Sequence, residues 1–252
     1  MFRKLFLLLA LLAPTAAAAQ SLQGFYIGAA GGPNFAGSPE SSDGHVQFNT
    51  DVGGLGLASL GWAFDNGFRV ELEGSYRSNG ISSIDTLRVN GRHEPIGIQQ
   101  GNTPGLNTWA AMLNGAYDIP LANFGLAWPF QPYIGAGVGF AWLDLANVSG
   151  DEPAIIHLPA NNTYTGPAAI SFGSGSAFAY QAIAGASMPI TLVPGLEATL
   201  EYRFFGTSRA SSSETVTAQT TDLINGAIPS AQITRGFVLN DNSLLLGLRY
   251  RF

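Results

Sequence analysis

The chain has 252 residues, of which 46% are hydrophobic and only 11% are charged, and it contains 32 glycines and no cysteine. Its formal net charge is -6, and Lys4 is its only lysine. These values exclude a charged disordered protein, a disulfide scaffold and a cysteine-ligated metal protein, and they argue against nucleic acid as a partner. The question is then where so weakly charged a chain places its apolar surface.

Residues 1–19 are typical of a secretory signal peptide. Arg3 and Lys4 form a positive start, residues 5–13 form an apolar centre too short to span a bilayer, and residues 17–19 are alanines suited to cleavage. The alternative is an uncleaved membrane anchor. Cleavage near Gln20 would leave residues 20–252 as the mature chain, and the lack of cysteine excludes lipoprotein acylation.

After residue 20 no apolar run approaches the length of a spanning helix, and the dominant pattern alternates with the period of two that indicates strands. At the C-terminus, for example, Leu244, Leu246 and Leu248 share one face, and Arg249 and Arg251 share the other. Eight segments alternate in this way, three of them less clearly than the others. They are 25–35, 55–64, 68–77, 109–119, 133–142, 178–188, 196–204 and 244–252.

The connections between these segments alternate in length. Asp65-Asn66-Gly67 is a tight hairpin signal, and two other connections, at about 120–132 and 189–195, are also short. Four polar connections are long, at about 36–54, 78–108, 144–177 and 206–242. An even number of strands with short turns at one rim and long loops at the other predicts an all-β, eight-stranded antiparallel transmembrane barrel. Both termini would lie at the short-turn, periplasmic side.

The two faces of the predicted strands differ in charge. One face carries no charged residue in any of the eight segments. A soluble barrel also alternates, but its outer face should be charged, whereas arginine at a bilayer midplane costs about 2–4 kcal/mol. The uncharged face is therefore predicted to meet lipid. The opposite face carries a barrel-interior ion-pair cluster: Arg69, Glu71, Glu73, Glu201, Arg203 and Arg249.

Aromatic residues on the uncharged face gather near the predicted strand ends, as in the two interfacial girdles of membrane barrels. Those at the short-turn ends are Phe25, Phe64, Phe68, Tyr117 and Phe252; those at the long-loop ends are Phe35, Tyr76, Trp109, Trp142, Phe178 and Phe204. Two features fit less well. Pro33 cannot donate to a strand ladder, so the first strand is expected to end near Gly32 or to bulge there. Leu55 and Leu57 fall on the inward side of the second strand.

Several strings resemble the OmpA/opacity-type eight-stranded outer-membrane proteins, over the whole mature chain. They are Gly24 to Gly28, Phe68 to Gly74, Leu200 to Phe204 and the terminal Tyr250-Arg251-Phe252. The resemblance implies an integral protein of the cell outer membrane of a Gram-negative bacterium. It also implies that Leu248, Tyr250 and Phe252 form the C-terminal signature read by the barrel-insertion machinery. Larger members add a periplasmic peptidoglycan-binding domain, which is not expected here because the chain stops at Phe252.

An eight-stranded barrel has an interior that side chains just fill. The charged cluster is therefore expected to form a polar plug; the alternative is a gate whose ion pairs switch to open a narrow pore. Of the nine mature arginines, Arg77 and Arg251 also point inward, and the four others lie in loops: Arg88, Arg92, Arg209 and Arg235. The inward glycines are expected to make room for arginine side chains. These are Gly28, Gly32, Gly61, Gly135, Gly137, Gly139, Gly185 and Gly247.

No catalytic, cofactor or metal site is predicted. His45, His93 and His157 lie in three different long loops, and Asp85, His93 and Glu94 form an acid–base set that no motif supports. The glycine-rich run 135–139 lies inside a strand and lacks the following helix of a nucleotide site.

The predicted role is structural and exposed at the cell surface. It comprises envelope integrity, with adhesion or surface-antigen functions through the loops. A narrow pore for ions or small solutes is the alternative, and a lipid-modifying barrel enzyme the third. Expected partners are outer-membrane lipid and lipopolysaccharide, the insertion machinery, and a host or surface ligand at the loops.

Overall fold

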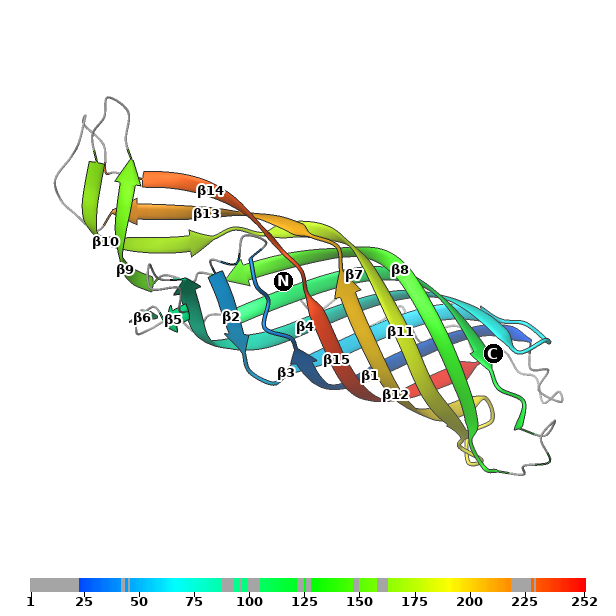
Figure 1. The fold of residues 1–252 in the computed structure, drawn as a ribbon. Helices are drawn as coiled ribbons and strands as arrows, with labels where there is room; N and C mark the ends of the chain where they lie inside the picture. Colours follow the sequence, from blue (N-terminus) through cyan, green and yellow to red (C-terminus); the bar gives the residue numbers. More distant parts are fainter. Residues whose placement is uncertain are drawn as a thin grey trace, which may run out of the picture.

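The protein consists almost entirely of β-strands in the computed structural model (Figure 1). The structure describes residues 23–41, 44, 46–87, 93–95, 97–98, 105–121, 125, 128–146, 150–157, 163–218, 228 and 230–252. The predicted signal peptide, residues 1–19, lies outside these described residues. No helix in the described part of the chain is long and apolar enough to cross a membrane.

Eight antiparallel strands form a closed barrel. Around its wall they follow the order β4, β3, β1, β15, β12, β11, β8 and β7, and pairing of β4 with β7 closes the ring. Each overlaps one predicted segment, so the prediction of an eight-stranded antiparallel barrel is confirmed. The bounds are β1 Gly24–Ala36, β3 Gly53–Ala63, β4 Phe68–Leu87, β7 Gly105–Asp118, β8 Gln131–Ala146, β11 Gly175–Pro189, β12 Leu196–Thr207 and β15 Asn240–Arg251.

The short connections lie at one end of the barrel, which we call the short-turn end. The predicted Asp65-Asn66-Gly67 hairpin is present between β3 and β4: Gly67 has a φ of +84°, and the Asn66 side chain accepts a hydrogen bond from Phe68 N at 3.2 Å. Arg251 N donates to Gly195 O at 2.8 Å, so the C-terminus is held against the turn between β11 and β12. The C-terminus therefore lies at the end opposite the outermost strands β9 and β10 (Figure 1).

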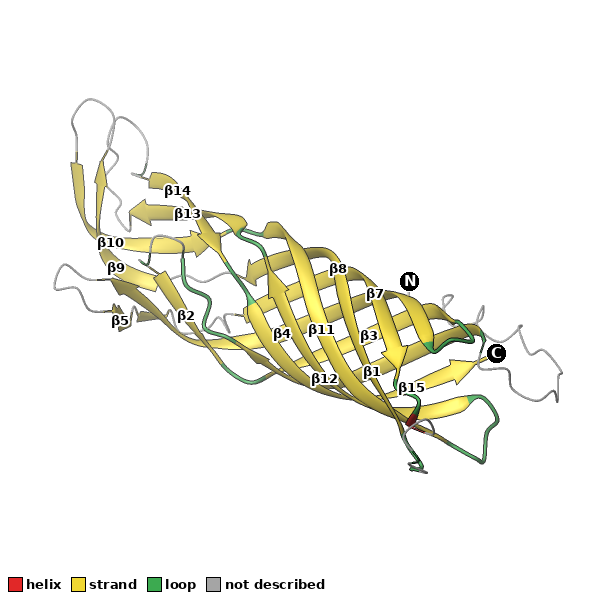
Figure 2. Ribbon diagram, turned by 45° about the vertical axis from the view of Figure 1, so that its right-hand side comes forward, coloured by secondary structure: helices red, strands yellow, loops and turns green. Residues whose placement is uncertain are grey.

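The other end, the long-loop end, is more regular than predicted. The four predicted long connections are present but contain strands, and β4 continues past Arg77 to Leu87 while β7 already begins at Gly105. The connections add a second, five-stranded sheet, the surface sheet, in the order β14, β13, β10, β9, β6, while β2 and β5 pair with the extension of β4. Figure 2 shows this sheet projecting beyond the barrel wall. The added strands are β2 Val46–Thr50, β5 His93–Pro95, β6 Gly97–Ile98, β9 Gly150–His157, β10 Thr163–Phe172, β13 Ala210–Ala218 and β14 Ser230–Phe237.

Pro33 does not end the first strand. β1 continues to Ala36, and its register with β15 is the same before and after Pro33, so the expected break or bulge at this position is wrong. The side chain of Pro33 faces outward and is exposed. A proline that lacks one ladder donor is tolerated here because the neighbouring pairs on both sides remain in place.

Side chains alternate between the two faces of the wall as predicted. Along β15, Leu245 is fully buried in the lumen, whereas Leu246 is 70% exposed on the outer surface. Leu55 and Leu57 of β3 face inward, yet the strand forms, because pairing with β1 and β4 on both sides fixes its register.

Candidate functional site in the barrel interior

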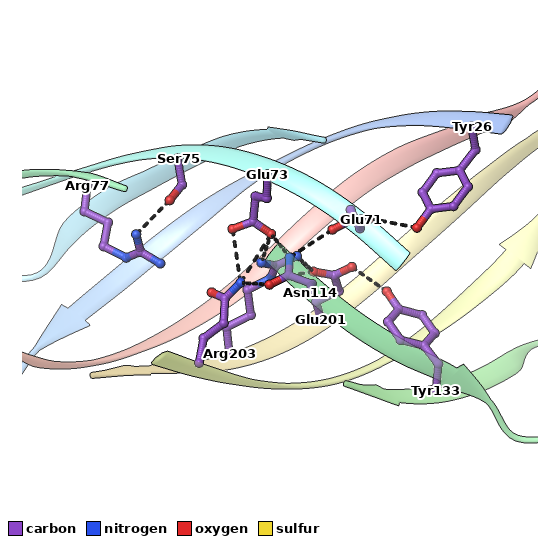
Figure 3. A network of polar contacts seen from close by, with 10 residues as sticks. Tyr26, Glu71, Glu73, Ser75, Arg77, Asn114, Tyr133, Glu201 and Arg203 are labelled. Atoms are coloured by element: carbon purple, nitrogen blue, oxygen red, sulfur yellow. Dashed lines mark hydrogen bonds and ion pairs between the residues drawn. The ribbon is translucent and has the colours of Figure 1, made fainter. Parts of the chain in front are cut away.

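The lumen collects the charged side chains of the barrel strands. β4 supplies two inward arginines and two glutamates, and β12 lies four places away in the ring, so the two strands face each other across the lumen. Because every second residue of a strand points inward, the charged positions form layers along the barrel axis. All six residues of the predicted ion-pair cluster lie on the inward face, and Figure 3 shows Glu71, Glu73, Glu201 and Arg203 of this cluster at close range.

Arg203 is the centre of the middle layer. Its side chain is 2% exposed and forms ion pairs with Glu73 across the lumen and with Glu201 on its own strand, the latter at 2.7 Å. A buried arginine would cost several kcal/mol if unpaired, and two carboxylates offset that cost. The pair Glu73–Arg203 therefore joins opposite walls of the barrel.

Two amide side chains complete the middle layer. Asn114 of β7 donates to Glu73 at 2.9 Å and to Glu71 at 3.2 Å, while Gln181 of β11 donates to Asn114 at 2.7 Å. A glutamate paired with one arginine still has free lone pairs, which must be satisfied when it is buried. The amides supply the missing donors for Glu73.

Two tyrosines form a layer nearer the short-turn end. Tyr26 donates to Glu71 at 3.1 Å, and Tyr133 donates to Glu201 (Figure 3). The guanidinium of Arg69 lies 4.6 Å from the ring centre of Tyr133, and that of Arg249 lies 5.4 Å from the ring centre of Tyr26. β1 and β8, which carry the tyrosines, are also opposite each other. Arg69 contacts both rings, since its guanidinium also lies 5.8 Å from the ring centre of Tyr26, so the cation–π contacts bridge a second diameter of the lumen.

The short-turn end is closed by ion pairs. Asp118 at the end of β7 pairs with Arg69 at 3.0 Å and with Arg251 at 3.7 Å. Glu197 at the start of β12 pairs with Arg251 at 3.1 Å and with Arg249 at 3.2 Å. β7 and β15 are opposite strands, so the contact of Asp118 with Arg251 bridges a third diameter.

Towards the long-loop end the lumen becomes less charged. Arg77 lies 3.7 Å from Asp241 and stacks on the ring of Phe205, with its guanidinium carbon 3.8 Å from the ring centre. Asn34 donates to Asp241 at 3.2 Å and accepts a hydrogen bond from Ser243 at 2.6 Å. This layer marks the boundary between the charged lumen and the apolar residues above it.

An apolar cluster covers the long-loop end, and we call it the apolar cap. Phe48 of β2 and Phe237 of β14 are both buried, with ring centres 5.3 Å apart. β2 and β14 lie in predicted loops. Their buried side chains pack on residues at the long-loop ends of β7, β8 and β11. The other large members of the cap are Val46, Ile81, Ile84, Leu106, Leu143, Leu145 and Leu239.

Two small cavities lie among the described residues of the lumen and the cap. A cavity beside Glu71 and Glu201 has a volume of about 10 Å³, and another, beneath Phe48 and Leu239, also measures about 10 Å³. Each has room for one water molecule. The described lumen is therefore filled by side chains that bridge it along three diameters and is covered by the apolar cap.

Comparison with known proteins identifies the kind of barrel. The sequence matches the outer membrane protein beta-barrel domain over residues 5–252. The chain belongs to this family. A curated "Outer membrane protein" of Gluconacetobacter diazotrophicus is 32% identical over 258 residues, which cover 95% of this chain and 60% of that protein.

Two outer-membrane proteins of known structure are among those to which the chain is similar. Neisserial surface protein A is 13% identical with a TM-score of 0.47, and the match covers 91% of this chain and 97% of that one. The outer membrane protein OprG from Pseudomonas aeruginosa is 10% identical with a TM-score of 0.46, over 91% and 97% of the two chains. The family match over residues 5–252 makes the protein an outer-membrane β-barrel, as its sequence resemblance implied.

In this outer-membrane barrel the uncharged face meets lipid. The predicted girdle residues Phe25, Phe64 and Phe68 are exposed near the short-turn end, and Trp109 and Trp142 are exposed near the long-loop end. Phe252 packs against Phe25 with 5.9 Å between ring centres and against Tyr250 with 5.1 Å, while Leu248 is exposed on the same face. A role of Leu248, Tyr250 and Phe252 in membrane insertion stays a prediction.

Sequence reasoning found the charges of the lumen and missed their partners. Alternation gives no reason to pair Asp118, Glu197 and Asp241, at strand ends, or Tyr26 and Tyr133 with the charged cluster. The available signal for the two tyrosines was their position opposite the inward glycines Gly61 and Gly185. The apolar cap carries no periodic signal, because its members are scattered over all four of the long connections.

The inward glycines have a different role from the predicted one. A Cβ atom on Gly61 would lie 2.5 Å from the ring of Tyr26, and one on Gly185 would lie 2.6 Å from the ring of Tyr133. The prediction that these glycines make room for arginines is therefore wrong for this pair, since they accommodate the tyrosines on which the arginines stack.

Of the three histidines, two lie in strands that the structure describes. His45 lies outside the described residues, as do Arg88 and Arg92. His93 and His157 lie in β5 and β9, and the backbone of β5 pairs with β4 so that Thr86 faces Glu94 and Asp85 faces Pro95. The described residues contain no group of three or more histidine, aspartate or glutamate side chains placed to hold a metal ion.

Proposed function

We propose that the protein is a closed structural barrel of the outer membrane that presents the surface sheet to the outside of the cell. The observation that carries this proposal is the filled lumen: Glu73 and Arg203 join opposite walls, and the apolar cap lies above them. Breaking such a buried ion pair leaves an uncompensated charge and costs about 3–5 kcal/mol. A lumen filled in this way favours a structural role of the barrel over conduction of solutes.

The surface sheet supports a recognition role. β14 is the last strand of the sheet, and Gln232, Ile233 and Thr234 are exposed along it. Exposed strand edges offer unpaired backbone groups to an added strand. We therefore expect adhesion or immune recognition to depend on this sheet, with a host or surface ligand as the partner.

Conductance measurement tests the closed lumen. Purified protein in planar bilayers is expected to show no reproducible conductance steps, and a deletion strain is expected to become sensitive to detergent or to shed membrane vesicles. Stable channels, or an envelope that is fully normal without the protein, would contradict the structural role.

The alternative function is a narrow pore for ions or small solutes. The charged lumen favours it, because Arg203 could release Glu73 and keep its pair with Glu201 by a side-chain movement alone. If wild-type protein conducts, Glu73→Gln should change the open probability, while Glu40→Gln, outside the lumen, should not.

No enzymatic activity is expected of this chain. Lipid A from a deletion strain should carry the same acyl chains as lipid A from the parent, and a missing chain would point to a lipid-modifying enzyme. Outer-membrane lipid, lipopolysaccharide and the barrel-insertion machinery are the other proposed partners.

A further inference from the structure

The surface sheet ends in a strand whose outer side has no described strand along it. β14 pairs with β13 over its whole length and is the last strand of the sheet in the described part of the chain. An isolated bridge from Ser41 to Phe237 covers only the inner end of β14. Further out, Gln232, Ile233 and Thr234 are exposed. We call residues 230–236 along this side the β14 edge.

The β14 edge lacks the features with which β-sheets block the addition of a strand. Protected edges carry lysine, proline or a bulge, or consist of very short strands. Residues 230–236 contain no lysine or proline, β14 has 8 residues, and its register with β13 does not shift. The charged residue of the edge, Arg235, forms an ion pair with Glu214 of β13. The edge is therefore open to pairing with a further strand.

The side chains beside the edge form an uncharged face, which we call the hydroxyl face. It is the side of β13 and β14 opposite the buried residues Glu214 and Val216. Positive charge occurs only at its inner end among the described residues, where a Cβ atom on Gly236 would meet the side chain of Arg209. The exposed members of the face bear hydroxyl or amide groups: Ser211, Ser213, Ser230, Gln232 and Thr234.

The β14 edge is complementary to a second copy of itself that runs in the opposite direction. A two-fold axis through Ile233, the middle residue of the edge, would place Ile233 opposite Ile233, and Gln232 opposite Thr234 of the second copy. Ile233 is 40% exposed, so each copy would cover the apolar side chain of the other, and the Gln232 amide can donate to the Thr234 hydroxyl. Arg209 and Arg235 would then lie at opposite ends of the strand pair. A parallel pair in register would instead bring these like charges together.

The direction of β14 decides where such a second copy must lie. β14 begins beside the outermost strands β9 and β10 and runs back towards the barrel, where β15 continues the chain into the wall (Figure 1). Two barrels side by side in one membrane therefore both have β14 running towards that membrane. Antiparallel pairing requires a copy whose β14 runs the other way, and a barrel in a facing membrane provides it.

We propose that the β14 edge joins two copies of this protein in facing outer membranes, through an antiparallel pair of β14 strands. The inference rests on the exposure of the surface sheet in the proposed function, and it names a second copy of this chain as the surface ligand. One strand pair is a small interface. Two facing membranes carry many copies, so the pairs act together and the contact between cells is stronger than any one of them.

Aggregation of phosphatidylcholine vesicles that contain the purified mature protein tests the proposal. Wild-type vesicles carrying two different dyes should co-aggregate, as measured by light scattering and fluorescence cross-correlation. The double substitution Gln232→Lys with Thr234→Lys would place like charges opposite each other twice in the strand pair, and it should slow aggregation at least tenfold. Gln232→Glu with Thr234→Glu should do the same. Mixing the lysine vesicles with the glutamate vesicles should restore aggregation, because each pair then joins opposite charges.

Ser171→Lys with Ser213→Lys is the matched control, since both residues are exposed on the hydroxyl face but lie on β10 and β13, inside the edge. It adds the same charge and should aggregate like wild type. Folding of each variant is checked by its migration in SDS before and after boiling. Dispersed wild-type vesicles, an equal loss in the control, or no recovery in the mixed sample would overturn the proposal. Folded, non-conducting protein whose vesicles stay dispersed would overturn this inference alone and leave the closed structural barrel in place.

Discussion

Arg203 shows how this barrel tolerates charge at membrane depth. Its guanidinium lies between Glu73 and Glu201, and Glu73 in turn receives hydrogen bonds from Asn114. The pair of Arg203 with Glu73 and the hydrogen bond of Asn114 to Glu73 each join two strands, so these buried polar groups become contacts between walls. Stability and the closed state of the lumen therefore depend on the same residues.

Removing this arginine should be costly. In Arg203→Met two glutamates lose their buried counter-charge, and the free energy of unfolding is expected to fall by about 3–5 kcal/mol. Urea unfolding, followed by the loss of the fast-migrating band in SDS, measures the change. Arg209→Met, at an exposed position between β12 and β13, is the control and should unfold like wild type. Equal effects of the two substitutions would argue against the buried network.

Gly137 tests the close packing of the lumen. A Cβ atom there would collide with Oδ1 of Asn114, so Gly137→Ala should displace this amide from Glu73 and destabilise the barrel by about 1–3 kcal/mol. Gly74→Ala is the matched control, because a Cβ on that outward glycine meets nothing within 4 Å. It should be neutral or slightly stabilising, since alanine is less flexible than glycine in the unfolded chain. The midpoint of unfolding on heating in SDS distinguishes the two.

Alternation predicted most of the residues of the lumen. The inward positions of Arg69 and Arg249 followed from the period of two, because charge on the other face would meet lipid. The partners of these residues could not be predicted in the same way. Contact between Asp118 and Arg251 depends on which strands lie opposite each other, and that follows only from closure of the ring.

At the scale of elements, the sequence predicts the eight barrel strands well and the surface sheet poorly. Inside the membrane every outward residue must be apolar, so the alternation is strong. Above the rim both faces of β4 can carry serine, threonine or asparagine, and only Ile81 and Ile84 mark the buried side. Two buried residues are too few for a recognisable period.

The apolar cap should couple the surface sheet to the barrel. Phe48→Ala removes a buried ring that packs on Phe237, and such a cavity costs about 3–5 kcal/mol. We expect faster cleavage of the surface strands by added protease while the barrel stays folded. Phe35→Ala removes an exposed, lipid-facing ring of similar size and should leave the cleavage rate unchanged. Equal cleavage of both variants would mean that the cap does not hold the sheet.

For the whole molecule, closure of the barrel predicts resistance to SDS. The backbone groups of the wall are paired around the ring, and no strand of the barrel is left with a free edge along the membrane. Unboiled protein should therefore migrate faster in SDS gels than boiled protein, because the folded barrel remains compact. Identical migration of the two samples would contradict a closed barrel.

Backbone pairing beyond the rim also affects how the exposed strands meet a ligand. From Arg77 to Leu87 β4 covers about 34 Å at the usual rise per residue and pairs with β2 and β5, while the strands of the surface sheet pair with one another. Ordering a flexible loop on binding costs about 1–2 kcal/mol for each residue fixed. A sheet that is already ordered avoids this entropic cost, so a few side-chain contacts at its exposed edge are enough for a measurable affinity.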